Sequence, residues 1–265
     1  MDIKTVKTKS STIDYIKFGQ GDNILVILPG LSAKSIMIFA QGIANAYKKF
    51  ANYYTIYVFD RKKEFPSSYS ISDIATDMIG VFEALGLNSI NLLGVSQGGM
   101  IAMKIATTKP QLIRKLVLCS TAACTKGNFS IVESWIDLAK ENKKEELFLK
   151  FSEDVFPHDV FIKSRDIFID GARTLTDNEL NRFIILAEGM KNFDVTEDLP
   201  KIESPILILG SVDDKVFNKD SSKQIYDCFN NRKDVFLSLY DGYGHAAYDY
   251  APNYKEEILS FLLGG

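Results

Sequence analysis

The sequence predicts an α/β fold in which a mostly parallel, twisted sheet is flanked by helices. The first observation is that short continuous apolar runs, such as 24–28 and 55–59, recur along the chain. Such runs are typical of strands that are buried on both faces of a parallel sheet. The second observation is that helix-period stretches alternate with these runs, as expected when right-handed crossovers connect parallel strands. The length of 265 residues suits one such domain, with or without an inserted subdomain.

The strands and helices of the main domain can be placed in order. Ser70 is expected to cap a helix, with Asp73 completing a capping box and Gly86 ending it. A second helix opens directly after Ser96 and closes before Pro110. Further helices are expected from Asp220 and over 254–262. Strands are expected at 3–9, 12–18, 24–28, 55–59, from 90, and at 115–119, 206–209 and 234–240.

Residues 121–200 break this alternation, because they contain no strand-like apolar run. Helices are expected there at 131–140, 144–151, 159–171 and 176–189. We therefore predict a core domain formed by 1–120 and 201–265, with residues 121–200 inserted as a helical cap. The segment is rich in aromatic residues, so we expect some to pack on the core and some to line a substrate cavity.

Composition excludes several classes of function. The 31 basic and 34 acidic residues give a net charge of −3, which offers no attraction to nucleic acid or to an anionic membrane. No apolar run approaches the roughly 20 residues that span a bilayer, and no secretory signal is visible. The three cysteines are too few and too irregularly spaced for a disulfide framework or a zinc site. We expect a cytoplasmic protein, and the sequence does not predict its oligomeric state.

The pentapeptide Gly94-Val95-Ser96-Gln97-Gly98 ends one apolar run and starts a helical pattern. This is the sequence form of a sharp strand-to-helix turn with a serine at its tip. The glycines leave room for the neighbouring chain, and the N–H of Gln97 would point toward a group bound to the serine. Alone, the pattern leaves open an incidental serine on a surface turn.

A serine nucleophile needs a base and a group that orients the base. Of the two histidines, His158 lies in the helical segment and is expected to be exposed, whereas His245 follows the last strand. The carboxyl ends of parallel strands meet at one edge of the sheet, so His245 and Ser96 are expected there together. Asp213 and Asp214 both follow the strand at 206–209, and either could orient the histidine.

The order Ser96, acid, His245 resembles the nucleophile–acid–histidine order of the α/β-hydrolase superfamily, in its branch of small cap-bearing serine hydrolases. The resemblance covers essentially the whole chain and implies an α/β-hydrolase fold. The acid turn of the family usually reads Gly-x-x-Asp-x-x-Val-Pro. Counted from Gly210, this register selects Asp213, with Phe217 in place of the proline. The resemblance thus implies Ser96 as nucleophile, His245 as base and Asp213 as orienting acid.

Two stretches depart from the family pattern. The first loop normally reads His-Gly, and here it reads Pro29-Gly30-Leu31. The resemblance implies that the N–H groups of Leu31 and Gln97 form an oxyanion hole, which the missing histidine does not threaten because the donors are backbone groups. After Asp60 the family commonly has Asp-x-Arg-Gly-x-Gly-x-Ser, whereas residues 60–68 contain no glycine. We expect a differently shaped loop there, which weakens substrate analogies.

The expected activity is hydrolysis of a small carboxylic ester through an acyl-serine intermediate. This chemistry takes a small-molecule substrate and needs no metal or organic cofactor. The same triad could instead serve a perhydrolase, a thioesterase, an amidase or a carbon–carbon hydrolase. A further alternative is a ligand-binding homologue that has lost turnover. Such homologues usually lack a triad residue, and none is missing here.

Overall fold

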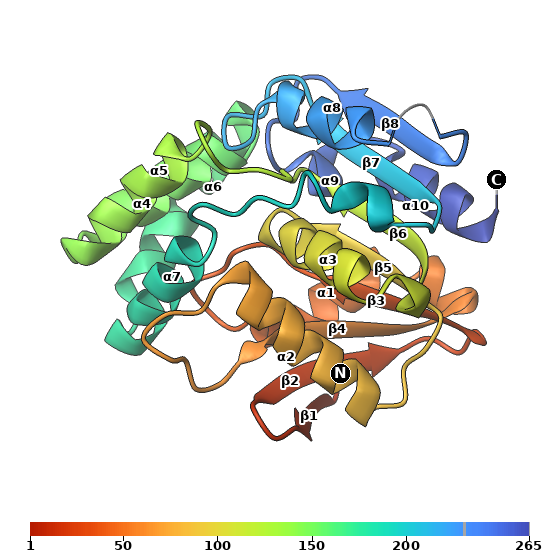
Figure 1. Ribbon diagram of the computed structural model, residues 1–265. Helices are drawn as coiled ribbons and strands as arrows, with labels where there is room; N and C mark the ends of the chain where they lie inside the picture. The colour runs from red at the N-terminus through yellow and green to blue at the C-terminus, as the bar shows by residue number, and fades with distance from the viewer. Residues whose placement is uncertain (230–231, 265) are drawn as a thin grey trace.

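The computed structural model describes residues 1–229 and 232–264. In these residues an eight-stranded sheet has the order β1-β2-β4-β3-β5-β6-β7-β8 (Figure 1). The pairs β1–β2 and β2–β4 are antiparallel, and every other pair is parallel. The predicted α/β class with a mostly parallel sheet is confirmed. The strands are Ile3–Lys7, Thr12–Phe18, Asn23–Leu28, Tyr54–Lys62, Ile90–Val95, Ile113–Cys119, Ile206–Ser211 and Val235–Tyr240, numbered β1 to β8.

Helices cover both faces of the sheet. On one face lie α2 (Ile71–Ala84), α3 (Gln97–Thr108) and α8 (Lys219–Asp227), and on the other lie α1 (Ala40–Ala46), α9 (Ala247–Tyr250) and α10 (Tyr254–Leu263) (Figure 1). The sequence did not predict α1, because this short helix has no side-chain cap and buries only Ala40. Single 3₁₀ turns occur at Ile36–Phe39, Phe50–Asn52, Pro110–Leu112 and Leu199–Lys201. No helix of the described residues is both long enough and apolar enough to cross a membrane.

The start of α2 shows how local sequence sets an element. The hydroxyl of Ser70 accepts a hydrogen bond from the N–H of Asp73 at 3.2 Å. The carboxylate of Asp73 accepts one from the N–H of Ser70 at 2.9 Å. These reciprocal bonds satisfy two N–H groups that the helix itself cannot pair. The predicted capping box is confirmed.

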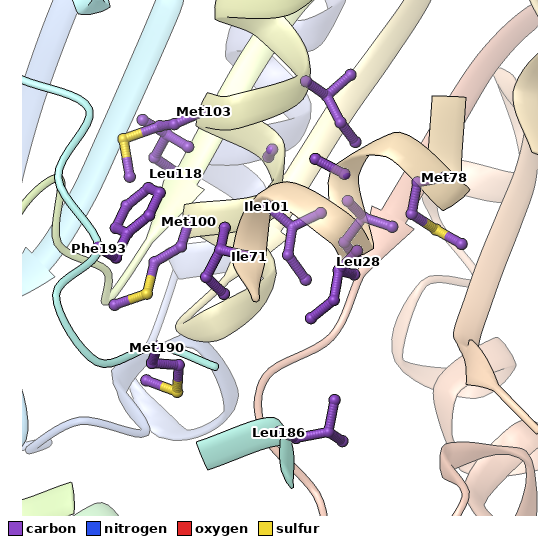
Figure 2. Close-up of a cluster of buried hydrophobic side chains, with 14 of the residues drawn as sticks. Leu28, Ile71, Met78, Met100, Ile101, Met103, Leu118, Leu186, Met190 and Phe193 are labelled. Atoms are coloured by element: carbon purple, nitrogen blue, oxygen red, sulfur yellow. The ribbon is translucent and has the colours of Figure 1, made fainter. Parts of the chain in front are cut away.

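The sheet divides the hydrophobic core in two. Every residue of β5 and β7 is buried, as expected of central parallel strands. Figure 2 shows part of the larger half, where methionines of α3 lie beside Leu118 and Phe193. Leu186 and Met190, which lie near the end of residues 121–200, belong to the same cluster. The core of the sheet therefore continues without a break into residues 121–200.

The chain between β6 and β7 holds α4 (Ser130–Lys140), α5 (Lys144–Val155), α6 (His158–Arg173) and α7 (Asp177–Glu188). These helices gather at one end of the sheet, where Figure 1 draws them in green. We call residues 121–200 the helical segment. The N–H of Val195 donates to the carbonyl of Ala123 at 2.9 Å, which ties the two ends of the segment together. The division of the chain into a core and a cap domain stays a prediction.

Strand β4 continues beyond the predicted end at Phe59, as far as Lys62. Its extra residues pair with β2, because Ile13 lies opposite Lys62 and the N–H of Lys63 donates to the carbonyl of Thr12 at 2.9 Å. Asp60 and Arg61 therefore belong to the sheet and are buried, each with 4% exposure. The expectation that a loop starts at Asp60 is wrong at these positions.

Gly98 packs so tightly that it should not tolerate even a methyl group. A Cβ atom there would lie 2.0 Å from the carbonyl oxygen of Leu28. We expect Gly98→Ala to lower the free energy of unfolding by about 3 kcal/mol or more, because backbone atoms would have to move. Gly80→Ala in α2 is the matched control, since a Cβ there meets nothing within 4 Å. It should raise stability by up to about 1 kcal/mol. Urea unfolding of both variants measures the difference, and equal stabilities would contradict the packing argument.

Candidate active site

Ser96 lies at the tip of the turn between β5 and α3. Its backbone has φ 52° and ψ −120°, a strained conformation for a residue with a side chain. The turn is possible because its glycines allow close approach: a Cβ at Gly94 would lie 2.4 Å from the carbonyl oxygen of Gly98. The N–H of Ser96 donates to the carbonyl of Cys119 at 2.8 Å. The sharp strand-to-helix turn expected from the sequence is present.

His245 follows β8 and reaches Ser96 across the end of the sheet. Its Nε2 lies 2.9 Å from Oγ of Ser96. The side chain is buried and its ring meets that of Phe217 edge to face, with centroids 5.6 Å apart. The N–H of Ala246 donates to the carbonyl of Val155 at 2.9 Å, which fixes the loop against α5. The structure thus brings together the serine and the histidine that the sequence singled out, and leaves His158 exposed at the start of α6.

The carboxylate that contacts the histidine belongs to Asp214. Nδ1 of His245 lies 2.9 Å from Oδ2 of Asp214, and the Asp214 side chain is only 1% exposed. Its other oxygen accepts hydrogen bonds from the N–H groups of Val216 and Phe217, at 2.8 and 2.9 Å. These two bonds aim the remaining oxygen at the imidazole. The prediction that Asp213 would occupy this position is therefore wrong.

The error has a physical cause in the length of β7. The strand does not stop at Gly210 but includes Ser211, which pairs with Tyr240 of β8. The turn that presents the carboxylate consequently starts one residue later than the register counted from Gly210 implies. A consensus spacing fixes a residue only if the strand ends where the consensus assumes.

Asp213 has a different set of partners. Its carboxylate accepts hydrogen bonds from the hydroxyl of Ser211 at 2.6 Å and from the N–H groups of Gly242 and Gly244 at 3.2 and 3.0 Å. Partial burial acts to raise the pKa of this carboxyl, but the hydrogen bonds outweigh it and leave the pKa below its ordinary value. Asp213 therefore holds the loop that carries His245, a contact that the sequence did not reveal.

The two residues expected to supply an oxyanion hole, Leu31 and Gln97, both lie close to the serine. Gln97 is the first residue of α3 and is fully buried. Leu31 lines the same cavity as Ser96, and a Cβ on the preceding Gly30 would lie 3.3 Å from Cβ of Ser96. In the described part of the chain, neither the N–H of Leu31 nor that of Gln97 has a hydrogen-bond acceptor. Both donors are thus free to bind another group.

A small apolar cavity of about 30 Å³ opens beside Ser96 and His245. The helical segment contributes much of its wall, through Trp135, Phe151, Val155 and Met190. A second cavity of about 140 Å³ shares Leu31 and Phe151 with the first. It is further lined by Ser32, Ala33, Lys34, Phe39, Leu147, Phe148 and Phe183. Larger surface hollows of about 470 to 710 Å³ lie elsewhere, but none of them includes Ser96 or His245. We call the 140 Å³ cavity the apolar groove.

Other polar side chains at this edge of the sheet do not join the pair. Asp60 binds the hydroxyl of Ser35 at 2.5 Å and the guanidinium of Arg182 at 2.5 Å. Ser120 is buried after β6, and its hydroxyl has no partner among the described residues. Within those residues no group of three or more His, Cys, Asp or Glu side chains is arranged to hold a metal ion.

Comparison with known proteins gives related folds and sequences. The family model described as serine aminopeptidase, S33, matches residues 67–249, which is more than half of the chain. The human serine hydrolase BPHL is 25% identical over 210 residues, covering 74% of this chain and 65% of its own length, just under two thirds. A putative carbamate hydrolase, RutD, from Pseudomonas savastanoi is 24% identical over 218 residues, covering 75% of this chain and 77% of its own.

A solved structure has the same fold. It is MGS-M2, an α/β-hydrolase enzyme from a deep-sea metagenome library of the Medee basin, and it superposes with a TM-score of 0.87 at 20% identity. The match covers 99% of this chain and 98% of that one. The eight-stranded sheet, with Ser96 at its strand-to-helix turn, therefore has the α/β-hydrolase architecture. The chain belongs to the serine aminopeptidase S33 family of α/β-hydrolases, and it is a hydrolase.

Proposed function

We propose that the protein hydrolyses a small carboxylic ester through an acyl-serine intermediate. Ser96 is the nucleophile, His245 is the general base and Asp214 is the orienting acid. The observation that carries this proposal is the continuous hydrogen-bonded chain from Ser96 through His245 to Asp214, with both contacts at 2.9 Å. This is the geometry that serine hydrolases of unrelated folds share.

In the first half of the reaction, Oγ of Ser96 attacks the ester carbonyl while Nε2 of His245 takes its proton. Asp214 accepts the hydrogen bond from Nδ1–H, which fixes the tautomer and stabilises the imidazolium that forms. Collapse of the tetrahedral intermediate breaks the bond to the alcohol oxygen, and His245 returns the proton to that leaving group. The acyl group then remains on Ser96.

In the second half, a water molecule takes the place of the alcohol. His245 removes its proton, the water oxygen attacks the acyl carbonyl, and the proton passes to Oγ of Ser96 as the acid leaves. In both halves the carbonyl oxygen becomes an oxyanion, which the N–H groups of Leu31 and Gln97 bind. Each such donor is worth about 3 kcal/mol in the transition state.

We propose further that the helical segment acts as a cap over this site. Its side chains Trp135, Phe151, Val155 and Met190 line the cavity beside Ser96. Such a cover excludes water and strengthens the hydrogen bonds to the oxyanion. The cavity of about 30 Å³ is roughly the volume of one water molecule, so a substrate must also use the apolar groove.

The apolar groove supports an uncharged substrate with a short apolar chain or ring. Leucine and phenylalanine side chains form most of its wall, and Lys34 is its only charged lining residue in the described part of the chain. Its volume of about 140 Å³ equals that of roughly four or five water molecules, which suits a chain of modest length. The names of the relatives include serine hydrolase and carbamate hydrolase, so ester, carbamate and amide substrates belong in one assay panel.

Labelling with a fluorophosphonate probe tests whether Ser96 is activated. We expect one labelled serine in the native protein, because His245 makes this hydroxyl nucleophilic. Ser96→Ala should abolish labelling and ester cleavage while leaving the circular dichroism spectrum unchanged. Mass spectrometry of the labelled peptide identifies the site. A folded native protein that fails to label would rule out a catalytic serine and would favour a ligand-binding role.

The neighbouring aspartates provide a matched pair for testing the acid. Asp214→Asn should lower kcat/KM by about 10³- to 10⁴-fold, because the amide would stabilise the wrong tautomer of His245. Asp213→Asn should lower it by about tenfold or less, since that carboxylate binds Ser211 and the loop after β8 but not the imidazole. Steady-state hydrolysis of p-nitrophenyl butyrate measures both. Similar losses in the two variants would contradict the assignment of Asp214.

Chain-length preference tests the apolar groove. Phe148→Ala enlarges the groove, so we expect the preferred acyl chain of p-nitrophenyl esters to lengthen by about two carbons. Phe168→Ala is the matched control: Phe168 stacks on Phe156 in the same helical segment, but does not line the groove. This control should keep the native preference. An unchanged profile in Phe148→Ala would show that the acyl chain lies elsewhere.

A further inference from the structure

Arg61 is a buried cation that the mechanism above does not use. It lies in β4 directly after Asp60 and is 4% exposed. Burial lowers the pKa of its guanidinium to about 10, so the group stays charged at neutral pH. Burying a charge is costly unless its contacts repay the lost hydration. Those contacts therefore indicate the role of the residue.

The guanidinium of Arg61 donates hydrogen bonds to neutral groups. Nη2 donates to the carbonyl oxygen of Pro29 at 2.7 Å and to Oε1 of Gln97 at 3.1 Å. The adjacent carboxylate of Asp60 is paired with Arg182. Nε of Arg61 has no acceptor among the described residues. The guanidinium therefore links two segments of the chain and forms no ion pair in the described structure.

These two segments carry both amides of the proposed oxyanion hole. Pro29 starts the loop that contains Leu31, and Gln97 supplies the second amide from its own backbone. A Cβ on Gly98 would lie 2.6 Å from the carbonyl oxygen of Pro29, so the loop and the start of α3 are already in contact. Because Nη2 of Arg61 donates to both, a single rigid guanidinium links the first loop to the start of α3.

The same contacts extend to the helical segment. Gln97 is fully buried, and its Nε2 donates to the carbonyl of Leu186 in α7 at 2.7 Å. One turn earlier in α7, Arg182 pairs with Asp60 at 2.5 Å. With Oε1 bound to Arg61, the Gln97 amide has a fixed orientation. Arg61 thus sits at the centre of a network that includes the first loop, α3 and α7.

We propose that Arg61 is a positioning residue that sets the spacing of the Leu31 and Gln97 amides around the oxyanion. This inference rests on the function proposed above. Donors in an oxyanion hole must lie within hydrogen-bonding distance of the transition state, and a misplacement of about 1 Å can cost about 100-fold in rate. Ground-state binding of the ester depends on the groove, which Arg61 does not line.

Arg61→Met tests the proposal because it removes the donors while keeping a chain of similar volume. We expect kcat for p-nitrophenyl butyrate to fall about 10- to 100-fold with KM within twofold of the native value. The rate of fluorophosphonate labelling should fall in parallel, since that reaction also builds charge in the oxyanion hole. The pH dependence of kcat/KM should not change, because Ser96, His245 and Asp214 remain. Arg61→Lys should lose less, since a lysine can still donate to both acceptors.

Lys62→Met is the matched control. Lys62 is the next residue of β4, has a side chain 14% exposed, and pairs with Asp77 of α2 at 3.0 Å rather than with the first loop or Gln97. Removing this cation should lower stability but leave kcat unchanged. Here kcat is calculated per active enzyme, which is counted as the Ser96 labelled after long incubation with the fluorophosphonate probe. A role for Arg61 in stability alone would give the same result for Arg61→Met, and that result would overturn the proposal.

The outcomes separate this inference from the proposed function. If the native protein neither labels nor cleaves esters, the proposed function fails and the role of Arg61 fails with it. If the native protein is active and Arg61→Met keeps its kcat, only the role of Arg61 is overturned. If Arg61→Met does not fold, Gln97→Met decides, because it keeps the backbone amide and removes the acceptor of Arg61. A fall in kcat of about fivefold or more supports the proposal, and an unchanged kcat overturns it.

Discussion

The contact between Gly98 and the end of β3 is the constraint on which the site depends. The positions of the glycines let α3 start against the carbonyl of Leu28, with no space for a side chain between them. This contact brings the loop after β3 beside Ser96. A Cβ atom on Gly30 would lie only 3.3 Å from Cβ of Ser96. The strained backbone of Ser96 persists because every residue of β5 and of 97–103 in α3 is buried, so neither element can relax separately. Backbone packing thus places the serine and the two free amides before any side-chain chemistry is considered.

The two adjacent aspartates show how one turn can serve two tasks. Asp214 is buried, and two backbone N–H groups bind its Oδ1, so that its Oδ2 faces Nδ1 of His245. Asp213 points to the loop after β8 and holds it at Gly242 and Gly244. One carboxylate therefore orients the imidazole and the other holds its backbone. Chemically identical side chains acquire different roles because the turn presents them to different partners.

The sequence was sufficient to predict the sheet, because buried parallel strands have continuous apolar runs, as in Ile206 to Leu209. It was also sufficient to predict the Ser96–His245 pair, because the chain has only two histidines. It was insufficient where a contact depends on a strand end. Strand β7 extends to Ser211, which moves the turn that carries the acid by one residue. Strand β4 extends to Lys62, so that Asp60 lies within the sheet and is buried. Hydrogen bonds between distant strands decide both ends, and no local pattern records them. The short helix α1 was missed for a related reason, since packing rather than a cap holds it.

The buried charges explain why residues 60–68 can depart from the family pattern without loss of the site. Asp60 binds Arg182 of α7, and Arg61 binds the first loop and Gln97, so two successive residues of β4 connect the sheet to both. Alternation along a strand sends neighbouring side chains to opposite faces, which lets adjacent residues reach different partners. In this chain the charged side chains of Asp60 and Arg61 therefore bind β4 to the segment after β3, at Ser35 and Pro29. The position of α7 and the positions of the amides proposed for the oxyanion hole then depend on the same few hydrogen bonds, so a shift of α7 should also displace these amides.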